Sequence, residues 1–405
     1  MTAREFAVEV VQKLQQAGFE ALWAGGCVRD QLVGRQPKDY DVATNATPDQ
    51  VREVFGKKRT LSIGASFGVI TVLGPKSAGQ IEVATFRRDT GYSDGRRPDA
   101  VEFTDAREDA IRRDFTINGM FFDPINEKVI DYVDGQLDLE AEQIRAIGNP
   151  HERIEEDKLR MLRGIRFAAT FDFSLEPETL AAIQKHAPEI TVVSGERIGA
   201  EMRRMLACSK RMLAVELLRE SGLLAAILPV GSSLYANAQH WGKTIAALQR
   251  LDPGDFESAA AILLEPIIAD QGIGVIFKCW KLSTDESKTI AWICKNWRTL
   301  DQAQDLSWSE IQPLLLHSDI LRCLAVADAQ KTDPSKGVAF CRERLEWPPE
   351  KLDPKPFLDG GDLIKLGIER GPQFKRILES VRRAQLNGEI DTVEQARRIA
   401  LDTVS

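Results

Sequence analysis

The sequence has no long hydrophobic run. Within its 405 residues, no apolar stretch reaches the roughly 18 residues that a membrane-spanning helix requires. The N-terminal segment carries a charged residue every few positions, which is not typical of a secretory signal. We therefore expect a cytoplasmic protein without a membrane partner. A chain of this length exceeds one compact core and predicts two to four domains.

Paired cysteines and clustered histidines are also missing. The six cysteines are scattered, with no Cys-x-x-Cys pair, which indicates neither a disulfide framework nor a zinc site and fits a reducing compartment. The four histidines stand far apart, with no His-Glu-x-x-His motif and no His-Asp dipeptide. Nothing in this pattern builds a Ser-His-Asp triad.

A net positive charge is missing as well, since the formal net charge is −8. This argues only weakly against nucleic-acid binding, because distant charges are screened beyond about 10 Å and a local basic face decides phosphate binding. Arginine clusters are concentrated before residue 206, in segments 87–99, 112–114, 160–167 and 201–206. Each alone is typical of a solvated helix face, but together they favour a phosphate-binding surface.

Helix-like and strand-like patterns alternate over about the first 135 residues. Thr2 and Glu5 predict a capping box for an opening helix that stops near Gly18. Thr47 before Pro48 predicts the start of another helix. Between and after these helices, segments 20–26 and 39–44 read as short strands.

Two further segments, 67–74 and 80–86, alternate in polarity and are rich in β-branched residues, so a hairpin is expected there. From about residue 137 apolar residues recur at spacings of three and four, which is typical of helices. The predicted fold class is α+β, with an α/β head that contains a small sheet and an all-α remainder. The firmest boundary in the helical part is the proline-rich segment 346–357.

The stretch "GGCVRDQLVGRQPKDYDV" combines two glycines, an arginine and an Asp-x-Asp pair. Gly25 and Gly26 allow backbone N–H groups to approach a phosphate closely, and Arg29 follows one turn into a predicted helix that begins near Val28. On a strand, Asp39 and Asp41 would project to the same face, where Mg²⁺ would relieve their repulsion. An isolated Asp-x-Asp is more often a surface strand edge; the neighbouring phosphate-binding features favour a metal site.

Glu82, in the predicted strand "QIEVATF", is the candidate for a third carboxylate of a two-metal site. An outward-facing strand charge is an equally good interpretation of this residue. The following segment, 87–103, is rich in Gly, Asp and Arg and is expected to be a mobile loop over the site.

Segment 109–119 is expected to begin as a helix that carries Arg112 and Arg113, and Asn118 could hydrogen-bond a ribose hydroxyl. In "EEDKLRMLRGIRF", residues three apart lie near one another on one side of a helix. This places Asp157, Arg160, Arg163 and Arg166 together. Ordinary salt bridging on a solvated face is one interpretation.

The other interpretation of this helix is recognition of a base. Asp157 can accept a hydrogen bond from the exocyclic amine of cytosine or adenine, and Arg160 can donate to the adjacent ring acceptor. Such a pair would favour C and A, which carry that amine, over U and G.

As an ordered set, "GGCVRDQLVGRQPKDYDVAT", "RRDFTINGM", "DYVDGQLDLE", "EEDKLRMLRGIRFAATFDF" and "ERIGAEMRRML" resemble the class II tRNA nucleotidyltransferase and bacterial poly(A) polymerase family. The resemblance covers roughly residues 20–206. It implies a polymerase-beta-like nucleotidyltransferase head at 1–136 and a helical neck at 137–215. It also implies a helical body at 216–345 and an RNA-binding tail at 346–405.

The resemblance implies Mg²⁺ as cofactor and tRNA, CTP and ATP as partners. Gly26 and Arg29 match the family's phosphate contacts, Asp39 and Asp41 its metal ligands, and Glu82 its third carboxylate. Arg112 or Arg113 matches a contact in the "RRDFTIN" motif. The residues that match the nucleobase-selecting helix are Asp157, Arg160, Arg163 and Arg166.

Several departures and alternatives accompany the resemblance. "SFGVITV" replaces the family's Gly-Thr-Val, with Gly68 as the equivalent glycine, and the body lacks the His-Asp dipeptide of hydrolase relatives. The intact segment 87–103 argues against a CC-only enzyme, because CC-only members lack much of it. CCA addition is favoured; an A-adding enzyme, a poly(A) polymerase and a non-catalytic RNA-binding relative stay open.

Overall fold

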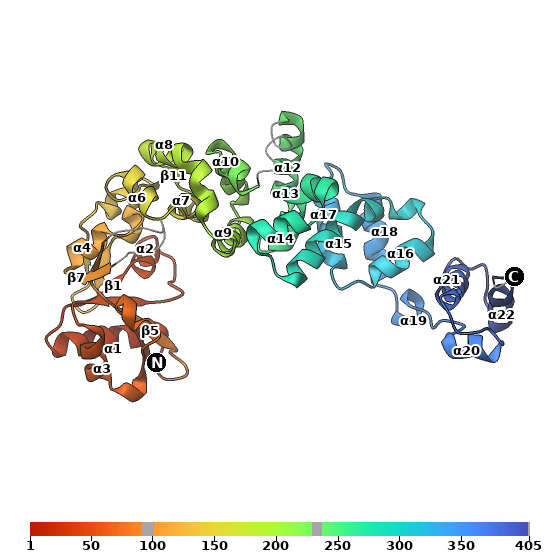
Figure 1. Ribbon diagram of the computed structural model, residues 1–405, viewed down its shortest axis with the longest axis horizontal. Helices are drawn as coiled ribbons and strands as arrows, with labels where there is room; N and C mark the ends of the chain where they lie inside the picture. The colour runs from red at the N-terminus through yellow and green to blue at the C-terminus, as the bar shows by residue number, and fades with distance from the viewer. Residues whose placement is uncertain (91–99, 229–236, 404–405) are drawn as a thin grey trace. The chain divides into compact units, whose positions relative to one another are not determined.

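The computed structural model describes residues 1–90, 100–228 and 237–403 (Figure 1). The chain divides into two compact units, one formed by residues 1–232 with 278–281 and the other by 233–277 with 282–405. The first unit contains the sheet of the head and the helices that follow it, and the second unit is helical where it is described. The predicted α+β fold class is confirmed.

Seven strands of the described head form one mixed sheet in the order β3-β4-β5-β2-β1-β8-β9. Their bounds are β1 Ala21–Ala24, β2 Asp41–Thr44, β3 Thr60–Leu61, β4 Val69–Leu73, β5 Gln80–Thr85, β8 Phe121–Asp123 and β9 Lys128–Ile130. The predicted hairpin is the antiparallel pair β4–β5, while β2 and β5 pair in parallel. The parallel register places Asp41 beside Glu82.

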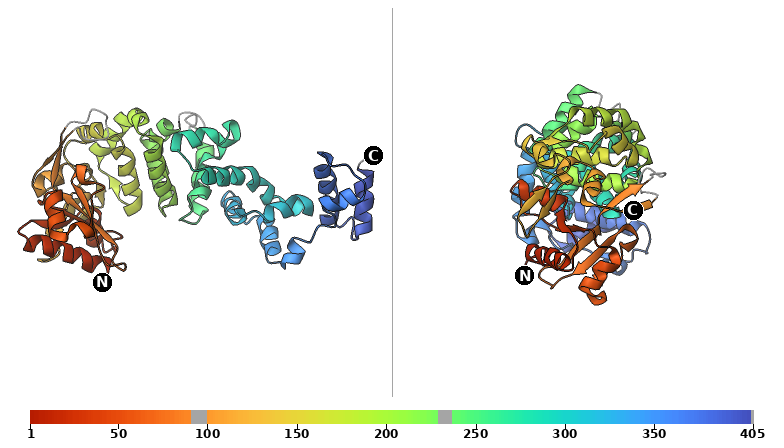
Figure 2. Two further views of the ribbon diagram at one scale, coloured as in Figure 1. Left: turned by 60° about the horizontal axis from the view of Figure 1, so that its bottom comes forward. Right: turned by 90° about the vertical axis from the view of Figure 1, so that its left-hand side faces the viewer.

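Helices α1 (Ala3–Gln16) and α3 (Pro48–Phe55) lie against one face of this sheet (Figures 1 and 2). Their apolar side chains join the strands in one core that includes Phe6, Val10 and Trp23. Both helices begin with the predicted capping boxes, formed by Thr2 with Glu5 and by Thr47 with Gln50. A second cluster packs α4 (Ala106–Ile111) against Phe86 and Phe121.

The prediction of a loop over residues 87–103 is wrong at both ends of that segment. Arg87–Thr90 forms β6 and Ala100–Phe103 forms β7, and the two pair in antiparallel. Arg88 and Glu102 form a cross-strand ion pair at 2.6 Å on the exposed surface. The middle of the predicted loop, 91–99, lies outside the described residues.

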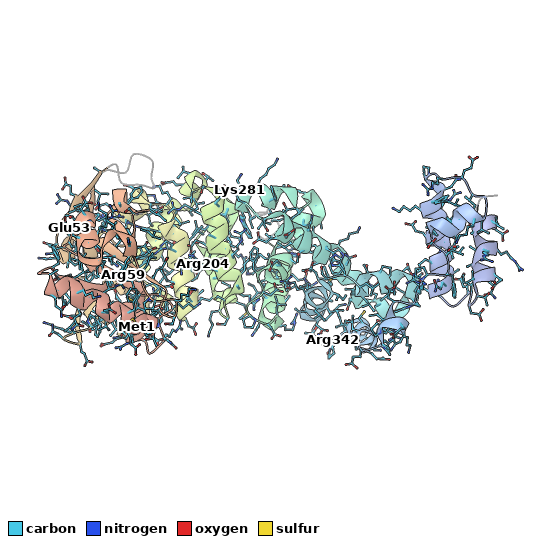
Figure 3. All side chains as sticks on the ribbon, turned by 90° about the horizontal axis from the view of Figure 1, so that it is seen from below. Met1, Glu53, Arg59, Arg204, Lys281 and Arg342 are labelled. Carbon is cyan, nitrogen blue, oxygen red and sulfur yellow. The ribbon has the colours of Figure 1, made fainter. Side chains whose placement is uncertain are left out.

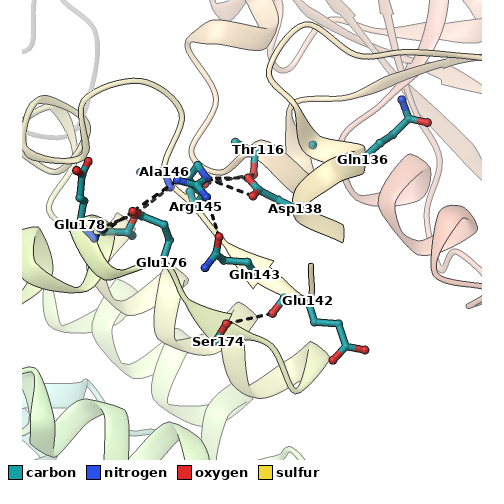
Figure 4. Close-up of polar contacts among 12 residues, drawn as sticks. Thr116, Gln136, Asp138, Glu142, Gln143, Arg145, Ala146, Ser174, Glu176 and Glu178 are labelled. Carbon is teal, nitrogen blue, oxygen red and sulfur yellow. Dashed lines mark hydrogen bonds and ion pairs between the residues drawn. The ribbon is translucent and has the colours of Figure 1, made fainter. Parts of the chain in front are cut away.

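The helices after the head are joined to it by a polar network around Arg145 (Figure 4). Its Nε donates to buried Asp138, which also accepts a hydrogen bond from Thr116 Oγ1 at 2.7 Å, and its Nη1 lies 3.5 Å from Glu176. The helices of this part are α5 Gly135–Glu140, α6 Pro150–Glu156, α7 Arg160–Phe171, α8 Pro177–His186, α9 Gly195–Ala207, α10 Arg211–Glu220 and α11 Leu223–Ile227. Two short parallel strands, β10 (Gln143–Ile144) and β11 (Ser174–Leu175), interrupt the expected helical pattern.

The helices after residue 237 are α12 Ala238–Arg250, α13 Phe256–Gln271, α14 Gly274–Trp280, α15 Thr284–Asp301, α16 Trp308–Leu315, α17 Ile320–Ala329, α18 Lys336–Leu345, α19 Pro349–Leu352, α20 Gly360–Lys365, α21 Gln373–Leu386 and α22 Val393–Asp402. The last three share a small apolar core that includes Leu363, Ile377 and Ala396. In the described part of the chain, no helix is long and apolar enough to cross a membrane. The four predicted domain ranges stay a prediction.

Candidate active site

A cleft of about 710 Å³ opens in the first unit. Its lining contains seven arginines and four aspartates, together with two glycines, Asn118 and Phe167. Twelve of the thirteen residues proposed from the sequence line it: Gly25, Gly26, Arg29, Asp39, Asp41, Arg112, Arg113, Asn118, Asp157, Arg160, Arg163 and Arg166. The exception is Glu82. The lining also includes Asp114, Phe167 and Arg204, which the sequence did not single out.

The Asp-x-Asp pair lies where the loop before β2 enters the sheet, because the strand begins at Asp41 and Asp39 precedes it. Burial and, after it, the nearby carboxylates of Glu82 and Asp39 together raise the pKa of Asp41 to about 6, against the lowering effect of Arg113. Glu82 thus lies close enough to interact with Asp41 without lining the cleft. Its predicted catalytic role stays a prediction.

The donor set at Asp39 and Asp41 fits Mg²⁺. This ion is typically held by one or two carboxylates together with substrate phosphates, and a cation would offset the repulsion that raises the pKa of Asp41. Within the described residues, no three acidic, histidine or cysteine side chains form a metal site by themselves. Water molecules and substrate phosphates would complete the coordination.

The two glycines lie at the start of α2 (Gly26–Leu32), two residues before the predicted helix start. Gly25 has φ = +70°, and a Cβ atom there would lie 2.8 Å from Nη1 of Arg113. The position therefore requires glycine for two reasons, its backbone conformation and its contact with a guanidinium group. This contact brings Arg113 over the turn that the sequence predicted to hold phosphate.

Each of the seven arginines of the cleft forms an ion pair with a carboxylate, which positions most of them before any ligand binds; the exposed Arg204 is held least firmly. The pairs are Arg29 with Asp30, Arg112 and Arg113 with Asp109, Arg160 with Glu156, Arg163 with Asp114, and Arg166 and Arg204 with Glu201. The predicted helix carrying Arg112 and Arg113 ends earlier than expected, at Ile111. Both side chains turn back to Asp109, which is almost fully buried.

Asp114 links two of the predicted elements. Its carboxylate accepts hydrogen bonds from Arg163 Nε at 2.8 Å and from Asn118 Nδ2 at 3.1 Å. Burial alone would raise the pKa of Asp114, but the charge of Arg163 and the hydrogen bonds from Asn118 and Arg163 lower it to about 2. Asn118 also accepts a hydrogen bond from Arg29 Nη1. Hydrogen bonds through Asn118 and Asp114 therefore connect Arg29 of α2 to Arg163 of α7.

The predicted placement of Asp157 in one helix with the three arginines is wrong. Helix α7 begins at Arg160, and Asp157 has an extended backbone (φ = −146°) between α6 and α7. Its Oδ1 accepts from the backbone N–H of Leu159 at 3.0 Å, and Arg197 of α9 donates to both carboxylate oxygens, at 3.1 and 2.7 Å. Sequence reasoning missed this role of Arg197, although the residue lies in the quoted motif "ERIGAEMRRML".

Asp157 and Arg160 both line the cleft, but they form hydrogen bonds with different residues. Arg160 donates to the backbone oxygens of Arg153 at 2.9 Å and Arg112 at 3.1 Å, and to Glu156 at 2.6 Å. Within the described residues these contacts use three of the five guanidinium N–H donors. A planar ligand edge could therefore still receive a hydrogen bond from this arginine.

Known proteins match this chain along most of its length. A family model described as the poly A polymerase head domain matches residues 21–145, and one described as a probable RNA and SrmB-binding site of polymerase A matches 172–234. A CCA-adding enzyme of Limosilactobacillus reuteri is 33% identical over 396 residues, which is 95% of this chain and 93% of its own. One of Enterococcus faecalis is 37% identical over 297 residues, covering 72% of this chain and 70% of its own.

Solved structures of CCA-adding enzymes are also similar to this chain. The crystal structure of the Bacillus stearothermophilus CCA-adding enzyme in complex with CTP has a TM-score of 0.79 and 27% identity, covering 99% of this chain and 98% of its own. The head match and the arginine-lined carboxylate cleft define the class, a nucleotidyltransferase with a poly(A)-polymerase-type head. More narrowly, the chain belongs to the family of CCA-adding enzymes, and the predicted resemblance is confirmed.

Proposed function

We propose that the cleft adds C, C and A to the 3′ end of tRNA from CTP and ATP, with Mg²⁺ as cofactor. The observation that carries this proposal is the convergence of Asp39 and Asp41 with seven carboxylate-paired arginines in one cleft. Such a surface complements a metal-bound triphosphate and an RNA end at the same time. The 3′-hydroxyl of the RNA attacks the α-phosphorus, a new phosphodiester bond forms, the hydroxyl proton leaves and pyrophosphate is released.

In this proposal Asp39 and Asp41 would hold Mg²⁺, which supplies charge neutralisation at the triphosphate and activation of the attacking hydroxyl, in a two-metal site if two ions bind. Glu82 beside Asp41 adds negative charge to this site. Gly25 and Gly26 bring backbone close to the phosphates, and Arg29, Arg112 and Arg113 bind them. Asn118 orients the ribose.

The base of the incoming nucleotide lies at the start of α7. Asp157, held by Arg197, accepts a hydrogen bond from the amine of C or A, and Arg160 donates to the neighbouring ring acceptor. Arg163 and Arg166 stabilise this end of the cleft. We also place the enzyme in the cytoplasm, where the substrates occur and where six free cysteines would stay reduced.

The product distinguishes CCA addition from the other activities of the family. Full-length curated relatives named CCA-adding enzyme favour CCA over A-only or poly(A) synthesis. The test uses a tRNA that ends at the discriminator base, given CTP, ATP or both. We expect two C with CTP alone and C-C-A with both nucleotides, whereas a long A tract or addition with ATP alone would contradict the proposal.

Two variants test the assigned residues. Asp39→Ala with Asp41→Ala should fold but lose incorporation, and continued extension would exclude this metal pair. Asp157→Asn should lower discrimination of CTP and ATP against UTP and GTP more than it lowers RNA binding.

Titration of the wild type with Mg²⁺–CTP separates an enzyme from a non-catalytic RNA-binding relative, because the latter would not bind the nucleotide.

A further inference from the structure

Arg204 of α9 lines the cleft but has no role in the binding of the incoming nucleotide described above. Its side chain is 62% exposed, in contrast to Arg166, which lies beside it and is 12% exposed. It comes from α9, whereas the phosphate-binding glycines and Arg29 come from the head and the metal carboxylates from the edge of β2. Arg204 is labelled in Figure 3.

The ion pair of Arg204 is weak for a residue of this cleft. Glu201 is 4% exposed and already accepts from Arg166 Nε at 2.5 Å, while Nη1 of Arg204 reaches it only at 3.3 Å and from a solvated position. Exposed pairs of this kind contribute little to stability, and the buried pair of Arg166 with Oε2 keeps a cation beside Glu201 when Arg204, which bonds Oε1, moves away. Arg204 can therefore exchange Glu201 for another anion at small cost.

The position of Arg204 points to the RNA as that anion. Arg166 follows Arg160 by six residues in α7, which is about 9 Å along a helix axis, and Arg204 shares its carboxylate partner with Arg166 and not with Arg160 at the start of the helix. Besides the incoming nucleotide, the reaction brings one other polyanion into the cleft, the 3′ end of the RNA. We propose that Arg204 binds a backbone phosphate of that 3′ end and helps to place the terminal hydroxyl; this inference rests on the proposed function.

The test compares Arg204→Gln with the wild type in binding and in turnover. Fluorescence anisotropy with a labelled tRNA lacking CCA, without nucleotide, should show roughly tenfold weaker binding, the size of one charge-assisted contact. The slope of log K against log salt should become less steep by about 0.7, because one phosphate contact to a single strand is lost. The KM for tRNA should rise, while the KM values for CTP and ATP stay unchanged.

Arg203→Gln is the matched control on the same helix. Arg203 does not line the cleft, and its Nη2 donates to the backbone oxygen of Lys281 at 3.3 Å. We expect wild-type RNA binding and an unchanged salt slope for this variant. Arg204→Lys, which keeps the charge, should restore most of the slope, whereas a purely structural role would not depend on charge.

Three results would overturn the inference. One is RNA binding by Arg204→Gln with wild-type affinity and salt slope; another is a raised KM for CTP with an unchanged KM for tRNA, which would assign Arg204 to the nucleotide. An equal change in Arg203→Gln would show a nonspecific effect of charge. Failure of the proposed function appears differently, as absent incorporation by the wild type, and the binding assay does not require incorporation.

Discussion

Arginine–carboxylate pairs in the cleft and in the helical second unit have similar distances but different surroundings. Arg163 lies 2.5 Å from Asp114 in the cleft, and Arg342 of α18 lies 2.6 Å from Asp328 of α17 in the second unit. The side chains of Arg163 and Asp114 are 33% and 10% exposed, whereas those of Arg342 and Asp328 are 60% and 31% exposed. Burial, and not distance, therefore decides how much each pair matters.

The reason is the cost of an unpaired charge. In the cleft, removal of one partner leaves the other partner poorly solvated, so the pair holds the structure in one arrangement. In the second unit, water replaces the lost partner. The four predictions below test this contrast, from the largest expected effect to the smallest.

Asp41→Asn should abolish most nucleotide incorporation, by roughly a thousandfold or more, because a proposed ligand of the catalytic metal is lost. The free energy of unfolding of this variant should be higher than that of the wild type at neutral pH. The pKa of Asp41 is raised to about 6 in the folded protein from an ordinary value of 3.8, so its ionisation costs stability as pH increases through this range.

Incorporation assays and thermal melting in EDTA measure the two effects. The gain in melting temperature of Asp41→Asn should be present at pH 7 and vanish near pH 4. Glu53→Gln, which removes an exposed charge from the same head, is the control and should leave incorporation unchanged. A less stable Asp41→Asn at pH 7 would contradict the assignment of repulsion at this site.

Gly25→Ala should lower incorporation by roughly ten- to a hundredfold. Alanine is strained at φ = +70°, and its Cβ would lie 2.8 Å from Nη1 of Arg113, so a guanidinium group that we propose to bind phosphate is displaced. Gly34→Ala is the matched control, with φ = +71° and nothing within 4 Å of the new Cβ. Both variants should lose about 1 kcal/mol in denaturant unfolding. Equal incorporation by the two would show that the contact with Arg113 is unimportant.

Asp114→Asn should lower the free energy of unfolding by about 2 kcal/mol at pH 7, since the pKa of Asp114 is lowered from 3.8 to about 2. The folded state favours the ionised carboxylate, so this stability is present above pH 4 and is lost as the pH falls toward 2. Urea unfolding over this range should show the wild-type and variant curves converging. A difference that persists at pH 2 would indicate a packing defect.

Asp328→Asn should change the free energy of unfolding by less than about 0.5 kcal/mol, although its ion pair with Arg342 is as short as the pair in the cleft. The same urea titration at pH 7 measures it, and incorporation should be unchanged. A loss as large as that of Asp114→Asn would remove the contrast between the two regions.

Local signals in the sequence predicted local structure correctly. The capping boxes at Thr2 and Thr47 and the β4–β5 hairpin depend on residues within a few positions of one another, so the sequence contains the whole signal. The errors occur where distant partners compete with local periodicity. The predicted helix through Arg112 ends at Ile111, and the backbone oxygen of Arg112 accepts a hydrogen bond from Arg160, 48 residues away.

The candidate site shows the same division. Residue types and motif order were sufficient to select twelve residues that line one cleft. Their partners were not predictable from spacing, because Asp157 pairs with Arg197 across 40 residues and Asp114 with Arg163 across 49. Glu82 is the opposite case. Its strand was predicted correctly, but the sequence could not decide whether its side chain lines the cleft, and in the structure it does not.

The sequence by itself determined the chemistry that this protein can offer: two aspartates one residue apart, a pair of glycines and a series of arginines in an order typical of nucleotidyltransferases. The tertiary structure alone decided the long-range pairs of Arg163 with Asp114 and of Arg166 with Glu201, and which arginine stays exposed. Ion-pair strength depends on spatial proximity and burial, and neither is a function of spacing along the chain. For this reason Arg204 is exposed and Arg166 is largely buried in the fold, although the sequence pattern indicates the same position for both, on the face of a helix.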